Sequence, residues 1–168
     1  MPPQRKPVQL NPILKRTIQL RAYDLQSRGV SVTERLREHL PFVIGDSQQL
    51  QQVFLNILNN AYDAVREAVQ GPRIEISTSC TDNFVEVSFR DNGSGISQPD
   101  RIFDPFFTTK QVGEGTGLGL SICYGIVKEH GGEILCSNNT DGEGATFVVR
   151  LPAVTEFASL SAVAGVKP

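Results

Sequence analysis

Two asparagines and an aspartate form a polar stripe in the first half of the chain. Asn56 and Asn60 lie four residues apart, and Asp63 follows at helical spacing beside a row of apolar residues. Amide and carboxylate oxygens are hard ligands, and Mg²⁺ takes one or two of them while it holds the phosphates of a nucleotide. The stripe therefore predicts a magnesium site, with ordinary exposed residues as the alternative.

A short glycine-rich motif follows the strand-like run at 84–90. Asp91 comes first, and Gly93 and Gly95 follow it at alternate positions. Glycines allow a flat ring to approach the backbone, and a carboxylate at a strand end accepts hydrogen bonds from an exocyclic amine. The motif favours a pocket for such a ring, although a simple turn has the same composition.

Alternate glycines also precede the third helical pattern of the chain. Gly115, Gly117 and Gly119 lie where that helix is expected to begin, within the sequence GEGTGLGLS. Backbone N–H groups and the positive end of a helix are suited to phosphates. The motif is neither a dinucleotide-binding GxGxxG after a strand nor a Walker A motif, because no Gly-Lys-Ser/Thr follows.

The segment between these glycine motifs is irregular and rich in Gly, Pro, Asp and Thr. Irregular stretches of this length inside a domain are usually functional, so residues 91–115 are expected to include a lid. Residues 103–110 concentrate three of the nine phenylalanines, which predicts that the loop docks on an apolar surface. Lys110 ends this run, either as a partner for a phosphate or as a solvated residue of the lid.

These motifs need a scaffold, and periodicity predicts one of helices and strands. Helices are expected at about 11–29, 47–71 and 118–130, the first starting at Asn11-Pro12 and the second capped by Asp46 or Ser47. Strands are expected at 30–36, 73–81, 84–90, 133–137 and 145–151. The pattern indicates an α+β fold, a two-layer α/β sandwich whose mixed, mostly antiparallel sheet is covered on one face by about three helices.

The composition is that of a single domain, with 168 residues of which 39% are hydrophobic. A net charge of −2 provides no general field for nucleic acid or anionic lipid, so no nucleic-acid partner is expected. No apolar run reaches the roughly 20 residues that span a bilayer. The three cysteines lie far apart in no metal-ligand spacing, which predicts buried free thiols in a reducing compartment. Residues 1–7 are expected to be a linker or edge, 8–152 the domain, and 153–168 a tail.

The order of these motifs resembles the catalytic ATP-binding domain of sensor histidine kinases. Residues 52–61 (QVFLNILNNA) resemble its asparagine box, 91–95 its first glycine box, 103–110 its phenylalanine box, 115–119 its second glycine box and 142–146 its final glycine turn. The wording FDPFFTTK is most similar to the subgroup that includes nitrogen-regulation kinases. The resemblance covers about residues 8–151 and implies the GHKL fold shared with DNA gyrase, the large heat-shock chaperones and the MutL ATPases.

The resemblance implies ATP and Mg²⁺ as ligands, held between the asparagine-box helix and the lid. Asn60, helped by Asn56, would hold the metal, and Asp91 would bind the adenine amine. Catalytic roles would fall on Asn56, Asn60 and Lys110. The residues implied to contact the nucleotide are Asn60, Asp63, Asp91, Gly93, Gly95, Ile96, Phe103, Thr109, Lys110, Gly115, Thr116, Gly117, Leu118, Gly119 and Thr146.

One position separates the activities within this superfamily. Hydrolytic members carry a glutamate base one turn before the magnesium asparagine, and this chain has Asn56 there. Because an amide is no base, the resemblance implies transfer of the γ-phosphoryl group to a histidine rather than rapid hydrolysis. A serine kinase of the anti-sigma type and a nucleotide-binding interaction module without transfer activity are the alternatives.

The acceptor histidine of such kinases is usually followed by an acidic residue and then Asn-Pro. Neither His39 nor His130 lies in that motif, so His39 is predicted in a surface loop and His130 at a helix end. The resemblance therefore implies a histidine-bearing dimerisation domain in a longer parent kinase and a response regulator that acts through it. The isolated chain should not phosphorylate itself. The resemblance also places this domain in the cytoplasm, without direct membrane contact, whether or not the parent is membrane-bound.

Overall fold

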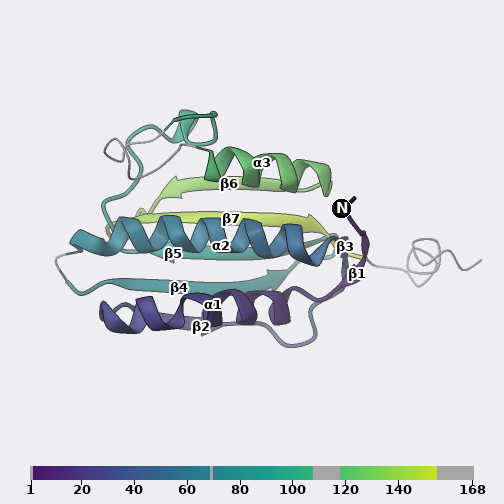
Figure 1. Ribbon diagram of the computed structural model, residues 1–168, viewed down its shortest axis with the longest axis horizontal. Coiled ribbons are helices and arrows are strands. Elements are labelled where there is room, and N and C mark those ends of the chain that lie inside the picture. Colours follow the sequence, from purple (N-terminus) through teal and green to yellow (C-terminus); the bar gives the residue numbers. More distant parts are fainter. Residues whose placement is uncertain (1, 69, 108–117, 155–168) are drawn as a thin grey trace, which may run out of the picture.

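Alternating side chains in β5 (Phe84–Asp91) decide which face of the sheet the helices cover. Val85, Val87 and Phe89 are buried, and the polar residues between them stay partly exposed. The helices lie together on one face of the sheet, where these apolar side chains join the core (Figure 1). The protein is seen here as a computed structural model that describes residues 2–68, 70–107 and 118–154.

Within these residues the main sheet has five strands in the order β2-β4-β5-β7-β6. Its other members are β2 (Ser31–Arg35), β4 (Arg73–Cys80), β6 (Glu133–Asn138) and β7 (Ala145–Pro152). β2 runs parallel to β4, and the remaining neighbours pair in antiparallel fashion. With α1 (Leu10–Ser27), α2 (Ser47–Ala64) and α3 (Gly119–Glu129) as the second layer, the predicted α+β sandwich is confirmed.

The start of α2 follows the sequence signal closely. Asp46 is the N-cap, and its side chain accepts the backbone N–H of Gln49 at 2.9 Å, as the capping rule predicts. Seven residues of the helix are buried: Leu50, Val53, Phe54, Ile57, Leu58, Ala61 and Tyr62. This apolar stripe faces the sheet, and the ring centroid of Phe54 lies 6.1 Å from that of Phe89. The polar stripe of the same helix therefore lies beside the core.

The end of α2 differs from the prediction. The α-helix ends at Ala64 and is followed by the 3₁₀ turn η1 (Val65–Glu67). The periodicity predicted a helix to about residue 71. The backbone N–H of Ser94 donates to the carbonyl of Ala64 at 3.4 Å, so the loop after β5 meets the last turn of the helix. The carbonyl groups at the helix end thereby gain a tertiary partner that periodicity cannot reveal.

Asn11 does not cap the first helix as predicted. α1 begins at Leu10 with Gln9 as its N-cap, and no side chain caps it. The side chain of Asn11 instead donates to the carbonyl of Arg37 at 2.8 Å and accepts the hydroxyl of Thr78 at 3.1 Å. Asn11 therefore ties α1 to the loop after β2 and to β4.

A two-stranded sheet that the sequence did not predict joins the start of the chain to the fold. β1 (Lys6–Val8) pairs with β3 (Val43–Gly45) in antiparallel register. The N–H of Gln4 also donates to the carboxylate of Asp46 at 2.7 Å. The predicted linker at 1–7 is therefore part of the fold from Gln4 onward. At the other end of the chain, Ala153 forms a bridge with Val43, and most of the predicted tail lies outside the described residues.

Candidate functional site

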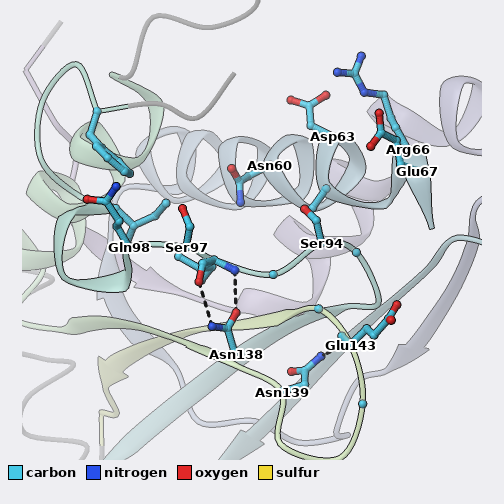
Figure 2. Close-up of a pocket in the computed structure, with 18 residues that line it drawn as sticks. Asn60, Asp63, Arg66, Glu67, Ser94, Ser97, Gln98, Asn138, Asn139 and Glu143 are labelled. Carbon is cyan, nitrogen blue, oxygen red and sulfur yellow. Dashed lines mark hydrogen bonds between the residues drawn. The ribbon is translucent and has the colours of Figure 1, made fainter. Parts of the chain in front are cut away.

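A pocket of about 770 Å³ lies between the end of α2, the loop after β5 and the turn from β6 to β7 (Figure 2). Its lining residues are Asn60, Asp63, Ala64, Arg66, Glu67, Gly93, Ser94, Gly95, Ile96, Ser97, Gln98, Ile102, Phe107, Asn138, Asn139, Gly142, Glu143 and Gly144. Of the residues predicted to bind a nucleotide, Asn60, Asp63, Gly93, Gly95 and Ile96 meet here. Asparagine box and first glycine box thus share one cavity, although they are separated by about 30 residues of chain.

Glycine is required at two positions of the loop after β5. A Cβ atom on Gly93 would lie 2.3 Å from the carbonyl oxygen of Ala64, so only glycine lets this loop pack on the end of α2. Gly95 has a φ of +83°, and a Cβ there would lie 2.8 Å from Oδ1 of Asn138. The two glycines therefore fix the wall of the pocket through contacts with α2 and with the end of β6.

Asp91 is a buried carboxylate directly beneath this wall, with 2% of its surface exposed. Its Oδ1 accepts the N–H of Gly93 at 2.9 Å and the N–H of Ala145 at 3.3 Å, whereas no described residue is seen to donate to Oδ2. Burial raises the pKa of Asp91, and the two backbone hydrogen bonds act in the opposite direction. Asp91 is not among the residues that line this pocket, although Gly93, whose N–H its carboxylate accepts, is one of them.

Asn56 lies one turn before Asn60 but outside the pocket lining. Its amide donates to the carbonyl of Gly119, the first residue of α3, across 3.4 Å. Beside it the thiol of Cys123 is buried and donates to the carbonyl of Val53. Asn56 therefore links α2 to the first turn of α3, a role that the prediction of a metal ligand did not include.

The phenylalanine box divides between the core and the pocket. Phe103 packs against Tyr124 of α3 and edge-on against Phe147 of β7, with ring centroids 5.8 and 6.3 Å away. Phe107 rather than Phe103 lines the pocket, and Arg101 lies over its ring. Phe106 is 73% exposed with a φ of +64°. The predicted docking of the loop is thus made by Phe103, whose predicted contact with a ligand is not seen in the pocket lining.

Thr146 is not among the residues that line the pocket. Its hydroxyl donates to the side chain of Asn139 at 2.6 Å, whereas the buried Ala145 sends its N–H to Asp91. Successive residues of a strand point to opposite faces of the sheet, so the one-residue difference decides which side chain is near the site. In β7 the residue that donates to Asp91 is Ala145, and the contact of Thr146 with a nucleotide stays a prediction.

Several predicted residues lie outside the described part of the chain. They are Thr109, Lys110, Gly115, Thr116 and Gly117, and with them the part of the predicted lid segment from residue 108 to 115. Leu118 and Gly119 are described, as the N-cap and the first residue of α3, and neither lines the pocket.

The pocket also includes residues that sequence reasoning missed. Glu67 continues the stripe of Asn60 and Asp63 at helical spacing, so the periodicity could have found it. Asn138 ends β6 and Asn139 begins the turn to β7, where asparagine is common, and no local signal separates the two from other turn residues.

The fold and this pocket define a nucleotide-binding ATPase domain of the GHKL type, as the resemblance implied. A protein family described as histidine kinase-, DNA gyrase B- and HSP90-like ATPase matches residues 45–155. The chain belongs to this family, within which its similar proteins are sensor histidine kinases.

Sensor histidine kinase ZraS of Escherichia coli strain K12 is 38% identical over 147 residues, covering 86% of this chain and 30% of ZraS. The solved catalytic domain of histidine kinase ThkA has a TM-score of 0.77 at 29% identity, covering 89% of this chain and 97% of that one. ThkA solved in complex with response regulator protein TrrA has a TM-score of 0.75 at 28% identity, covering 91% and 43% of the two chains. This chain spans about a third of the length of ZraS.

Proposed function

We propose that this chain is the catalytic domain of a two-component sensor histidine kinase. It binds ATP with Mg²⁺ and transfers the γ-phosphoryl group to a histidine on a separate dimerisation domain. The observation that carries the proposal is Asn60, which points from α2 into a pocket whose far walls are the glycine loop after β5 and the turn between β6 and β7. A nucleotide there would lie between the asparagine-box helix and the sheet.

The residues of the pocket suit magnesium. Asn60 and Asp63 supply an amide and a carboxylate, both hard oxygen ligands, on one helix face. Among the described residues no three His, Cys, Asp or Glu side chains are grouped to hold a metal ion. That is consistent with Mg²⁺, which keeps several waters and borrows oxygens from phosphates. The ion would neutralise charge on the triphosphate, and Asn60 is the residue proposed to hold it there.

Asp91 is proposed to select adenine. Its Oδ1 is already occupied by two backbone N–H groups, which leaves Oδ2 to accept a hydrogen bond from an exocyclic amine. The same two bonds hold the carboxyl group in place, so little ordering is needed when the base arrives.

The link between Asn56 and Gly119 supports transfer over hydrolysis. Asn56 occupies the place of the catalytic glutamate in hydrolytic relatives, and its amide is engaged with α3. No base therefore stands at that position to activate water. Phosphoryl transfer to an imported histidine depends mainly on positioning and charge neutralisation, which this domain is proposed to provide.

The acceptor is proposed to lie on another domain because both histidines of this chain are structural or remote. His130 is buried with both ring nitrogens hydrogen-bonded, and His39 lies exposed between β2 and β3. The solved complex of ThkA with its response regulator supports a response regulator as the downstream partner, reached through the phosphorylated domain.

Within the described residues no helix is long and apolar enough to cross a membrane. We propose a cytoplasmic position for the domain, which extends from about Gln4 to Ala153.

Labelled ATP tests the transfer. The chain alone should acquire no label, and addition of the histidine-bearing domain of its parent kinase should give label on that domain that is stable in base and lost in acid. Acid-stable label on a serine would favour the anti-sigma type of kinase. ATP binding without label on either protein would favour an interaction module.

A further inference from the structure

Two consecutive asparagines at the end of β6 reach opposite walls of the pocket. Asn138 is the last residue of the strand, and Asn139 begins the turn to β7. In Figure 2 the Asn138 amide meets the loop after β5, while Asn139 lies beside Glu143 on the other side. Neither residue belongs to the sequence motifs on which the family resemblance rests.

Asn138 holds one residue of the loop by both of its backbone polar groups. The N–H of Ile96 donates to Oδ1 of Asn138 at 2.7 Å, and Nδ2 of Asn138 donates to the carbonyl of Ile96 at 2.9 Å. This two-bond pairing resembles one rung of a β-ladder. Gly95 makes it possible, because a Cβ there would meet Oδ1 at 2.8 Å.

Asn139 holds the opposite wall. Its Nδ2 donates to the carbonyls of Asp91 and Glu143, each at 2.9 Å, and its own N–H donates to the carbonyl of Gly144. Thr146 donates to its Oδ1 and fixes the amide orientation. One side chain thus ties the glycine turn to the strand end that carries Asp91.

The loop at 92–98 and the strand β6 differ in how they are held in place. Residues 92–98 form no helix or strand, whereas β6 is hydrogen-bonded to β7 along its length and buries Ile134 in the core. The side chain of Asn138 therefore holds a loop that lacks regular structure against a strand that is fixed in the sheet.

We propose that Asn138 and Asn139 are positioning residues that set the affinity of the pocket for a nucleotide. The proposal rests on the proposed function, because it assumes that ATP occupies this pocket. The asparagines need not touch the ligand. Without them the chain still folds, but residues 93–98 and 142–144 sample positions that a bound nucleotide must first restrict, so affinity falls.

The first test compares Asn138→Ala with Asn11→Ala. Both replacements remove a side chain that makes two hydrogen bonds, but Asn11 lies on α1, where it contacts Arg37 and Thr78 outside the pocket. Affinity for Mg-ATP is measured by calorimetry far below the melting temperature of each variant. Asn138→Ala should bind about tenfold more weakly, the effect of roughly one lost hydrogen bond, while Asn11→Ala keeps wild-type affinity. Equal affinity of wild type and Asn138→Ala would overturn the proposal.

Asn138→Asp gives a readout that a purely structural role would not give. The ionised carboxylate still accepts from the N–H of Ile96 but places a second acceptor against its carbonyl, and protonation turns that oxygen into a donor. Affinity relative to wild type at the same pH should therefore recover as the pH is lowered from 7 to about 4, near the ordinary pKa of an aspartate. Asn138→Ala should show no recovery. Parallel behaviour of the two variants would contradict the proposal, and failure of wild type to bind ATP would refute the proposed function together with it.

Discussion

The backbone N–H of Asp46 donates to Nε2 of His130 at 3.1 Å, where the start of α2 meets the end of α3. The other ring nitrogen, Nδ1, lies 2.8 Å from the carbonyl of Ile126 and must donate to it, because a carbonyl only accepts. This fixes a neutral tautomer of a buried imidazole. A Cβ on Gly45 would lie 2.9 Å from the ring, so the glycine leaves the space for it.

His130→Ala should destabilise the domain by about 3 kcal/mol, since two hydrogen bonds and the packing of a buried ring are lost. Urea unfolding followed by circular dichroism measures the change. His39→Asn is the matched control, because His39 is exposed with a φ of +58° and asparagine tolerates that conformation. Similar loss of stability in the two variants would contradict the structural role of His130.

Asp46→Asn should show an acid-dependent stability difference from wild type. The N–H groups of Gln49 and Gln4 hold the pKa of Asp46 below its ordinary value of 3.8. A lowered folded-state pKa contributes stability that is fully present above the unfolded value and is lost as the pH falls through the folded value. The free energy of unfolding should therefore be larger for the wild type than for the variant at pH 7, and this difference should shrink below about pH 4. Unfolding curves from pH 7 to pH 3 decide it, and a constant gap would argue against the ionised cap.

Asp91→Asn should separate binding from stability. The amide oxygen still accepts from Gly93 and Ala145, and replacement of a carboxyl whose pKa burial raises removes the cost of a buried charge at pH 7. The variant should therefore be at least as stable as wild type. It should bind ATP about a hundredfold more weakly, because its NH₂ group would face the adenine amine as a second donor. A variant with unchanged ATP affinity would remove Asp91 from the site.

Cys123 should resist thiol reagents in the folded protein. Burial raises its pKa to about 12, so at pH 8 roughly one thiol in ten thousand is ionised. Cys80 and Cys136 are partly exposed and should react first. Mass spectrometry of the labelled chain, with and without denaturant, follows each site. Rapid labelling of Cys123 without denaturant would show that α2 and α3 separate readily in the native state.

Local patterns predicted the elements whose pairing partner is close in the sequence. The hairpin of β4 and β5 follows from alternating residues on both sides of a short turn, and the cap of α2 follows from Asp46 alone. β1 and β3 could not be found in this way. Each is three residues long, and the two strands lie more than 30 residues apart. Their pairing depends on tertiary structure rather than on periodicity.

The candidate site shows the same division. The asparagine and glycine boxes indicated Asn60, Gly93 and Gly95, and the structure brings these three residues to one pocket. Ala145, which donates its N–H to Asp91, was not indicated by the sequence, since the register of β7 against β5 is a tertiary property. Asn138 could not be predicted as a pocket residue, because its partner, Ile96, lies 42 residues away in the sequence.

Calorimetric titration of ATP with and without Mg²⁺, in the wild type and in Asn60→Ala, tests the central claim most directly. Alanine is a good helix former, so the variant should remain folded while it loses the amide oxygen that lines the pocket. Asn59→Ala, next to it on α2 and outside the lining, is the matched control. We expect Mg²⁺ to strengthen ATP binding in the wild type and in Asn59→Ala, and Asn60→Ala to lose this magnesium dependence. Equal, magnesium-dependent affinity in all three proteins would contradict an ATP site at the Asn60 pocket.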